Sequence, residues 1–332
     1  MLFRSNFWRT KFDNINSMAF KSFIVTLALL AVVGHSVAFE PLLESHLRYL
    51  EPLEKTQIIW DEKMLVGTWA NVDVEFQVIK YLASGGFSDI YLADDLITGQ
   101  KNIILKKMAK SFYFKPDRWN DAEKELAIMQ RLPKHPNICG FNRFVQDATH
   151  LYYSLENCGS SNVWKYAQNQ KWLTEKEARR IFKQALTAMD ILHSHKIFHL
   201  DFTEANMFYD ESTGLVKIGD FGLSISTDEK VIPKFGTPGY FTPERQTHTP
   251  LRPSGVDIWY MGIGIYRVIT GNNPFGLGET SAALTCMKQG LYVIPKDKSP
   301  DLLDLFKQIY KLDDERITLT ELKVHPWFTT LD

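Results

Sequence analysis

The segment from Ile197 to Asn206 reads IFHLDFTEAN, and it decides the fold and the chemistry that we expect. It places two oxygen-bearing side chains, Asp201 and Asn206, on a loop after a long amphipathic helical pattern. Soon afterwards residues 216–222 read VKIGDFG, a strand-like run that ends at Asp220. Carboxylate and amide oxygens suit Mg²⁺, and a carboxylate can accept the proton of an attacking hydroxyl. We therefore expect Asp201 to act as a general base, and Asn206 and Asp220 to hold Mg²⁺.

The chain changes its hydrophobic period near residue 160. Earlier strand-like runs lie at residues 76–82, 88–93, 101–107 and 151–155. A helix is predicted over Asp121–Leu132, which Pro133 ends. Beyond residue 160, Thr174 and Glu177 form a capping box ahead of an apolar stripe at helical spacing. The pattern predicts an α+β fold, in which a small β-rich lobe is followed by a larger α-helical lobe.

Lys106 and Glu125 form the next candidate pair. Glu125 lies on the inward stripe of the predicted helix, where a carboxylate needs a cationic partner. Lys106, near the end of the third predicted strand, is the expected partner. Lys107 is the alternative, because strand alternation places it on the opposite face. A lysine held in this way could contact phosphate groups.

A glycine pair separates the first two predicted strands, in the turn Gly85-Gly86-Phe87-Ser88. Glycine allows a backbone to approach a phosphate closely. A plain hairpin turn remains the alternative for this short segment.

Taken in order, these segments resemble the eukaryotic protein kinase superfamily over residues 75–330. HLDFTEAN is similar to the pattern H-R-D-L-x-x-x-N, DFG is intact, TPE at 242–244 stands for A-P-E, and ILKK at 104–107 stands for V-A-I-K. The resemblance implies a bilobal fold with an N-lobe at 75–156 and a C-lobe at 160–330. It also implies an enzyme that transfers the γ-phosphate of Mg-ATP to serine or threonine of a protein substrate, since Thr237 favours these acceptors over tyrosine.

The resemblance further implies a nucleotide site. Glu156-Asn157-Cys158 would be the hinge that binds adenine, with Leu155 as gatekeeper. The nucleotide contacts implied by the family are Ala83, Ser84, Gly85, Gly86, Phe87, Ser88, Ile90, Lys106, Leu155, Glu156 and Cys158. In the C-lobe, Arg316 would pair with Glu244.

Four positions depart from the family pattern. Ala83 and Ser88 stand where glycines are usual, and Ala83 is tolerable if its backbone is unstrained. Leu200 replaces the arginine that pairs with a phosphorylated activation loop, so we expect activity without loop phosphorylation. Thr203 stands where serine/threonine kinases carry a lysine, and its loss removes charge stabilisation from the transition state. We count Thr203 among the catalytic positions.

The same motifs, HLDFTEAN and ILKK, also resemble the FIKK kinases, a parasite family that is secreted or exported into host cells. That family carries H-L-D-L-T-P-E-N and a weak glycine loop. Within it, Leu200 and Thr203 would be family traits rather than damage. The alternative to an active kinase is a pseudokinase that binds a nucleotide or a partner and transfers nothing, although a scaffold is expected to lose one of the five polar groups described above.

The N-terminal residues have a different character. Scattered positive charges precede an eleven-residue uncharged run at 23–33, and Ser36-Val37-Ala38 offers a small-residue cleavage site. The run is shorter than the roughly 20 residues of a membrane span. We expect a secretory signal over 1–38 and a secreted or exported product. The alternatives are an uncleaved membrane anchor at 23–38, which would make the chain a tethered interaction module, and a buried helix. Residues 39–74 are an N-terminal extension without a motif.

Composition limits the partners. Lys and Arg number 38 against 39 for Asp and Glu, so we expect no nucleic-acid partner. A monomer is expected. Three cysteines, Cys139, Cys158 and Cys286, are too few for a disulfide framework and are expected to be unpaired thiols. Four basic residues could favour acidic substrates or be ordinary solvated charges: Arg118, Lys134, Lys230 and Lys234.

Overall fold

The computed structural model describes residues 72–84, 88–113, 116–159, 161–276 and 281–330. The predicted signal and anchor segments, and the predicted extension up to residue 71, lie outside the described residues. Gly85, Gly86 and Phe87 of the predicted glycine turn lie outside them as well.

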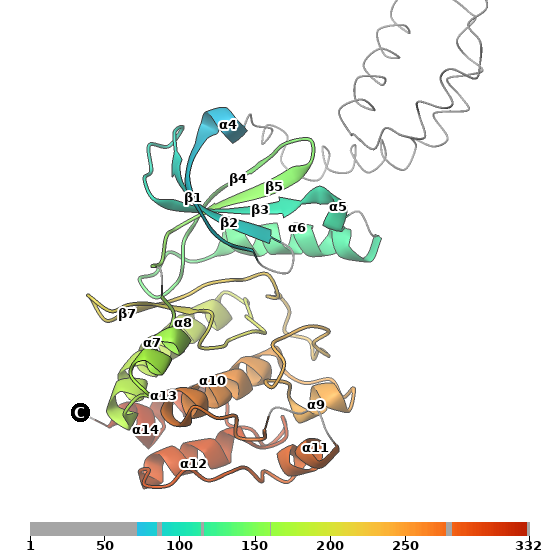
Figure 1. Cartoon of the computed structure of the whole chain (residues 1–332). Coiled ribbons are helices and arrows are strands. Elements are labelled where there is room, and N and C mark those ends of the chain that lie inside the picture. The colour runs from blue at the N-terminus through green and yellow to red at the C-terminus, as the bar shows by residue number, and fades with distance from the viewer. Residues whose placement is uncertain (1–71, 85–87, 114–115, 160, 277–280, 331–332) are drawn as a thin grey trace, which may run out of the picture. The chain divides into compact units, whose positions relative to one another are not determined.

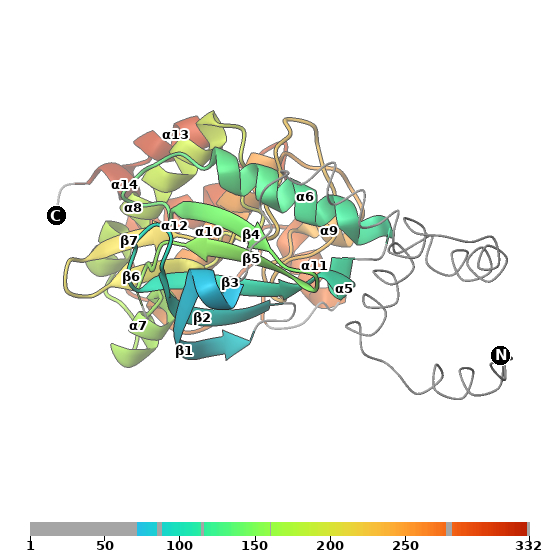
Figure 2. The same ribbon diagram turned by 90° about the horizontal axis from the view of Figure 1, so that it is seen from above.

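The smaller lobe is built on a five-stranded antiparallel sheet with the strand order β1-β2-β3-β5-β4 (Figure 1). Its strands are β1 (Phe76–Ser84), β2 (Ser88–Asp95), β3 (Ile103–Ala109), β4 (Phe141–Gln146) and β5 (His150–Leu155). A short helix precedes the sheet and two helices follow β3: α4 (Val72–Glu75), α5 (Lys110–Tyr113) and α6 (Pro116–Arg131). Figures 1 and 2 both show α6 lying along the sheet. Glu125 on this helix contacts Lys106 of β3.

The larger lobe is helical, apart from the short ribbon β6 (Met207–Asp210) and β7 (Leu215–Ile218). Its helices are α7 (Val163–Asn169), α8 (Glu175–Ser194), α9 (Pro243–Gln246), α10 (Pro253–Thr270), α11 (Ser281–Lys288), α12 (Pro300–Ile309), α13 (Leu319–Val324) and α14 (Pro326–Thr329). The predicted capping box of Thr174 and Glu177 is confirmed at the start of α8.

Helix α10 runs through the core of this lobe, and nearly all of its residues are buried. Pro253 at its first turn needs no hydrogen-bond acceptor for its missing N–H. Gly271 ends it in the left-handed conformation, with φ of 73°. Because the helix is apolar almost all round, its few polar residues must find partners, and two of them contact the loop at 197–206.

The predicted α+β fold with two lobes is confirmed, and the differences lie at element boundaries. The third strand begins at Ile103 rather than Lys101, because Asn102 adopts a left-handed turn with φ of 55°. The helix that carries Glu125 begins at Pro116 rather than Asp121. Strand β4 was not predicted, since FNRFVQ mixes polar and apolar residues without a clear period.

The expectation of three unpaired thiols is wrong for two of them. Cys139 and Cys158 form a disulfide, with their Cα atoms 6.1 Å apart, while Cys286 is free. The hairpin of β4 and β5 brings its own ends together, and the Glu156 amide donates to the Gly140 carbonyl at 2.9 Å. This proximity depends on β4, which has no clear pattern in the sequence.

Thiol labelling checks the pairing. We expect iodoacetamide to modify one cysteine, Cys286, in the unreduced, denatured chain, and all three after reduction, with intact-mass spectrometry as the readout. Labelling of all three cysteines without a reductant would contradict the disulfide.

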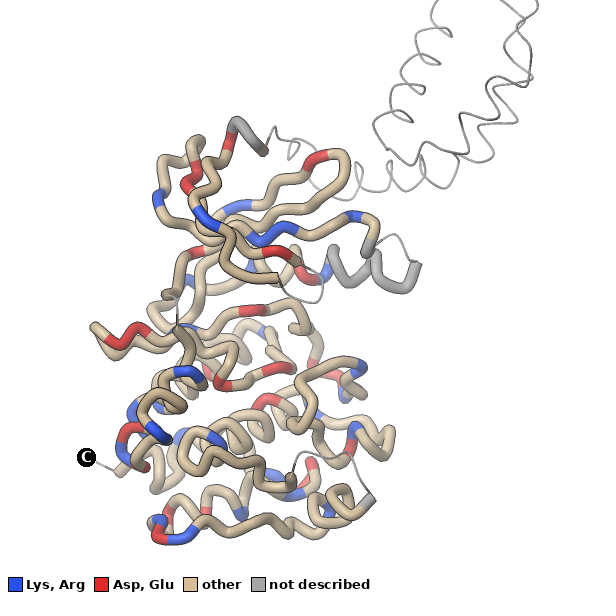
Figure 3. The backbone as a smooth tube through the Cα atoms, in the orientation of Figure 1, with Lys and Arg blue, Asp and Glu red and all other residues tan. Residues whose placement is uncertain are grey.

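Two surface properties bear on partners. Among the described residues, no helix is both long and apolar enough to cross a membrane. Figure 3 shows basic and acidic positions interspersed over the helical lobe. Lys230, Lys134 and Lys234 are all exposed, and Lys230 forms a surface ion pair with Asp314 at 3.0 Å. The arrangement favours ordinary solvated charges over a dedicated basic surface.

Candidate active site

The predicted ion pair of Lys106 and Glu125 is confirmed. The Lys106 ammonium lies 2.9 Å from a carboxylate oxygen of Glu125, which is buried on α6. It also lies 3.6 Å from the carboxylate of Asp220, and this positive charge holds the pKa of Asp220 below its usual value. Lys107 points elsewhere, 6.0 Å from the centre of the Tyr152 ring. The lysine thus links β3, α6 and the segment that follows β7.

Asp201 is held through both of its carboxylate oxygens. One accepts hydrogen bonds from the Thr237 amide at 3.1 Å and from the Thr237 hydroxyl at 2.7 Å. The other accepts one from the Asn206 side-chain amide at 3.0 Å. The Thr203 amide donates to the Asp201 carbonyl at 2.8 Å, which tightens the turn. These bonds fix the orientation of the Asp201 carboxylate, which could otherwise rotate about its side-chain bonds.

Helix α10 holds this loop through hydrogen bonds to one of its side chains. Buried Asp257 accepts hydrogen bonds from the amides of His199 at 2.9 Å and Leu200 at 2.7 Å. The His199 ring in turn bonds the Gly219 carbonyl at 3.0 Å and packs on Phe221, with ring centres 5.2 Å apart. The catalytic loop, residues 197–206, and the segment that begins at Asp220 are therefore connected through the buried His199 side chain.

The oxygen donors of Asn206 and Asp220 fit Mg²⁺. Asn206 points its NH₂ group at Asp201, which leaves its side-chain oxygen available as a ligand. The Asp220 carboxylate is exposed and ionised beside Lys106. No group of three or more His, Cys, Asp or Glu side chains within the described ranges could hold a metal by itself. Two protein ligands suffice for Mg²⁺, which takes its others from water and substrate phosphates.

The implied nucleotide contacts gather around β1, β2, β3 and β5. Ala83 pairs with Ile90 across β1 and β2, Ile90 pairs with Lys106, and Leu155 pairs with Ile104. Ala83 has no left-handed φ, so an alanine is unstrained there. The hydroxyl of neighbouring Ser84 donates to Asp89 at 2.9 Å, and β2 opens at Ser88.

The hinge candidate is tied to both lobes. Glu156 forms an ion pair with Lys217 on β7 at 2.6 Å and accepts a hydrogen bond from the Gly140 amide at 3.0 Å. Cys158 is anchored through its disulfide to Cys139, whose amide bonds the Ile218 carbonyl at 2.8 Å. The hinge is thus fixed beside the strand that leads to Asp220.

Residues 76–328 match the protein kinase domain family. The chain belongs to this family. Its kinase domain is 31% identical over 256 residues to the carbon catabolite-derepressing protein kinase of Candida glabrata, covering 76% of this chain and 41% of the relative. It is 32% identical over 266 residues to the serine/threonine-protein kinase PLK4 of Drosophila virilis, covering 78% and 34%. Sperm motility kinase 2B of Mus musculus is 29% identical over 263 residues, covering 78% and 53%. The chain spans about a third to a half of the length of these relatives.

Two departures from the kinase pattern have a clear structural setting. Leu200 is 6% exposed and packs into the core of the larger lobe, so an apolar side chain fills the place of the usual arginine. Thr203 is 2% exposed and contributes backbone bonds to the turn between Asp201 and Asn206. Its side chain is therefore buried within the kinase domain.

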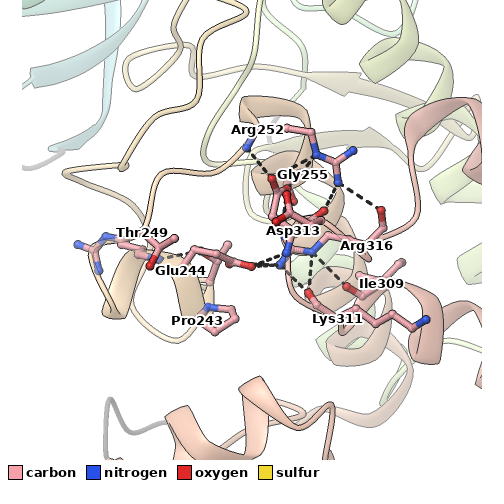
Figure 4. A network of polar contacts seen from close by, with 12 residues as sticks. Pro243, Glu244, Thr249, Arg252, Gly255, Ile309, Lys311, Asp313 and Arg316 are labelled. Atoms are coloured by element: carbon pink, nitrogen blue, oxygen red, sulfur yellow. Dashed lines mark hydrogen bonds and ion pairs between the residues drawn. The ribbon is translucent and has the colours of Figure 1, made fainter.

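The pair of Arg316 and Glu244 implied by the kinase resemblance is confirmed, with a shortest distance of 3.1 Å (Figure 4). Sequence reasoning did not assign site roles to Asp257 or Glu204, nor predict the contact of Thr237 with Asp201. A signal for Asp257 was present, since a lone carboxylate within an apolar helix needs buried donors. No local signal could have paired Thr237 with Asp201, 36 residues away.

Proposed function

We propose that the chain is an active serine/threonine protein kinase, which transfers the γ-phosphate of ATP to a hydroxyl of a protein substrate. One observation carries the proposal: Lys106–Glu125 are paired in the same structure in which Thr237 and Asn206 hold the Asp201 carboxylate. The pair proposed to bind phosphate and the carboxylate proposed to act as the base are therefore both held by their own contacts. The names of the relatives, which include serine/threonine-protein kinases, support this choice of acceptor.

The proposed roles follow from these contacts. Asp201 orients the acceptor hydroxyl and takes up its proton. Lys106, steadied by Glu125, would bind nucleotide phosphates. Asn206 and Asp220 would hold Mg²⁺, which neutralises phosphate charge when bound. The nucleotide would lie between the Ala83–Ile90 hairpin and the hinge at Leu155, Glu156 and Cys158.

The test is transfer of radiolabelled γ-phosphate from Mg-ATP to a generic protein substrate, followed by phosphoamino-acid analysis. Labelled phosphoserine or phosphothreonine supports the proposal. The alternative is a nucleotide-binding pseudokinase, motivated by the missing lysine at Thr203. No transfer, combined with a melting temperature raised by Mg-ATP, would favour that alternative.

We further propose that activity does not require phosphorylation of the activation segment, residues 220–244. Backbone bonds already join Phe198 to Ile225 and Val231 to Leu251 at 2.9 Å. Arg245 donates to the carbonyls of Pro233 and Lys234 at 3.0 and 3.1 Å. These contacts do the ordering that a phosphate would otherwise do through an arginine.

Phosphatase treatment checks this proposal. We expect the treated kinase to keep its initial transfer rate within about twofold, because no phosphate-binding arginine precedes Asp201. The rate is measured immediately after the phosphatase is removed, and mass spectrometry verifies that the segment is unmodified. A loss of more than tenfold that returns on incubation with Mg-ATP would contradict it.

The remaining proposals rest on sequence. Leu200 and Thr203 would be subfamily traits of the FIKK type, in a kinase domain over 75–330 that works as a monomer without a nucleic-acid partner. Residues 1–38 would direct the chain into the secretory pathway and residues 39–74 would be an extension. N-terminal sequencing of the product from a eukaryotic host tests the signal, and a mature start at Phe39 would support it.

A further inference from the structure

A buried carboxylate lies in the catalytic loop beside Asp201. Glu204 is 1% exposed and contacts two other segments of the larger lobe. The Tyr240 hydroxyl donates a hydrogen bond to one of its oxygens, and the Arg267 guanidinium lies 3.3 Å from the other. Burial raises the pKa of the Glu204 carboxyl, and the positive charge of Arg267 opposes that shift. The mechanism proposed above uses none of these three residues.

Arg267 is itself fixed by aromatic rings. Its guanidinium lies 4.3 Å from the centre of the Trp164 ring on α7 and 5.1 Å from that of Tyr240. The Trp164 amide also donates to the Glu204 carbonyl at 3.3 Å. The cluster therefore joins α7, α10, the catalytic loop and the activation segment around one carboxylate.

Helix α10 is shaped to admit this carboxylate. A Cβ atom at Gly264 would come within 3.3 Å of a Glu204 oxygen and 3.4 Å of the Phe182 ring. A side chain at this position would push against the carboxylate or the ring. The glycine lets Glu204 lie against the helix, one turn before Arg267.

The stability of the buried Glu204 carboxylate depends on its polar partners. A buried carboxylate costs several kcal/mol unless a cation and hydrogen bonds compensate it. Its compensation comes from Arg267 on a rigid helix and from Tyr240 in the activation segment. The carboxylate is therefore stable only when the catalytic loop and the activation segment are correctly placed against α10.

Two contacts then connect the same pair of segments. Thr237 bonds Asp201 directly, and Tyr240 bonds Glu204 three residues further along both segments. The Asp257 bonds hold the loop at His199 and Leu200, and the Tyr240 contact holds it further along, at Glu204. Two contacts, one of them anchored to α10, fix both the position and the direction of the Asp201 carboxylate.

We propose that Glu204, held by Arg267, is a positioning residue that sets Asp201 and the acceptor-binding part of the activation segment at Thr237–Tyr240 relative to each other. This inference rests on the proposed kinase function. It assigns Glu204 to the transfer step and to the protein acceptor, and not to nucleotide binding, because its contacts all lie within the larger lobe.

The experiment compares Glu204→Gln, Arg267→Met, Arg267→Lys and the double variant Glu204→Gln/Arg267→Met in the full chain. Glu175→Gln is the matched control, because Glu175 also has several polar partners but lies at the start of α8. The readouts are kcat and KM for a protein acceptor, KM for Mg-ATP, melting temperature, and hydrogen exchange of peptides that cover residues 201–206 and 237–240.

We expect Glu204→Gln to lower acceptor kcat/KM by about 10- to 100-fold, since an angstrom of misplacement has an effect of that order. KM for Mg-ATP should change by less than about threefold, because the nucleotide site is not touched. Arg267→Lys should keep more activity than Arg267→Met. The double variant should have an acceptor kcat/KM no lower than that of the less active of its two single variants. Exchange should quicken in both peptides with Glu204→Gln and stay unchanged with Glu175→Gln.

Two results would overturn the inference. One is a Glu204→Gln variant with unchanged acceptor kcat/KM and unchanged exchange. The other is a variant in which acceptor kcat/KM falls, KM for Mg-ATP rises to a similar extent, and the melting temperature falls as it does in Glu175→Gln. That result would show a purely structural role. If the wild-type chain transfers no phosphate, the proposed function fails instead, and the exchange measurement alone decides whether Glu204 positions the two segments.

Discussion

Replacement of Asp201 by asparagine is expected to lower phosphate transfer by about 10²- to 10⁴-fold, the usual contribution of a general base. The variant has nearly the same shape, so the Thr237 bonds to the remaining oxygen can persist. Its new NH₂ group faces the NH₂ of Asn206 and cannot accept the proton of an acceptor hydroxyl. The loss should therefore appear in kcat rather than in nucleotide affinity.

The measurement is the initial rate of γ-phosphate transfer, together with the rise in melting temperature on addition of Mg-ATP. Asp228→Asn is the matched control, because Asp228 is exposed and pairs only with the surface residue Lys196 among its described contacts. We expect Asp228→Asn to keep the wild-type rate. Full activity in Asp201→Asn would remove the proposed base and with it the mechanism.

The parts of this site that could be predicted are those that a local pattern encodes. Glu125 interrupts the apolar stripe of one helix, and strand alternation distinguishes Lys106 from Lys107, so their pairing follows from two short periodicities. The capping box at Thr174 is equally local. Strand β4 lacks such a pattern and is not predicted from the sequence. The proximity of Cys139 to Cys158 is therefore not predicted either, because only the hairpin of β4 and β5 brings them together.

The contacts that could not be predicted join residues far apart in the chain. Thr237 reaches Asp201 because the activation segment folds back over the catalytic loop. Asp257 meets the amides of His199 and Leu200 because α10 passes beneath that loop. Each residue alone resembles an ordinary polar residue in a turn or a helix. Their roles depend on tertiary packing, which a local hydrophobic period does not specify.

A second large effect is expected on stability, at the network around Arg316 (Figure 4). The Arg316 side chain is fully buried, and its guanidinium contacts Glu244 at 3.1 Å. It also donates to the carbonyls of Gly255 at 2.9 Å and Lys311 at 2.8 Å. Glu244 in turn accepts a hydrogen bond from the Asp313 amide at 2.6 Å. One side chain therefore joins the end of the activation segment to α10 and to the loop after α12.

Arg316→Met is expected to lower the free energy of unfolding by about 3–5 kcal/mol, because it leaves the Glu244 carboxylate buried without its cation. For a domain of this size that corresponds to a fall in melting temperature of about 6–20 °C. Urea or thermal unfolding followed by circular dichroism measures it. Arg316→Lys should recover only part of the loss, since an ammonium cannot reach the same set of carbonyls as a guanidinium fork.

Lys323→Ala is the control for charge removal, because Lys323 and Asp190 are both about half exposed and their ion pair should contribute no more than about 1 kcal/mol. A loss for Arg316→Met as small as that of Lys323→Ala would mean that water reaches Glu244. In that case Glu244 would not anchor the activation segment, and the order of that segment would have to come from its other contacts, among them those of Arg245 and the bridge of Val231 to Leu251. A large loss instead places the anchor of the activation segment in the core itself, where no phosphate is needed to maintain it.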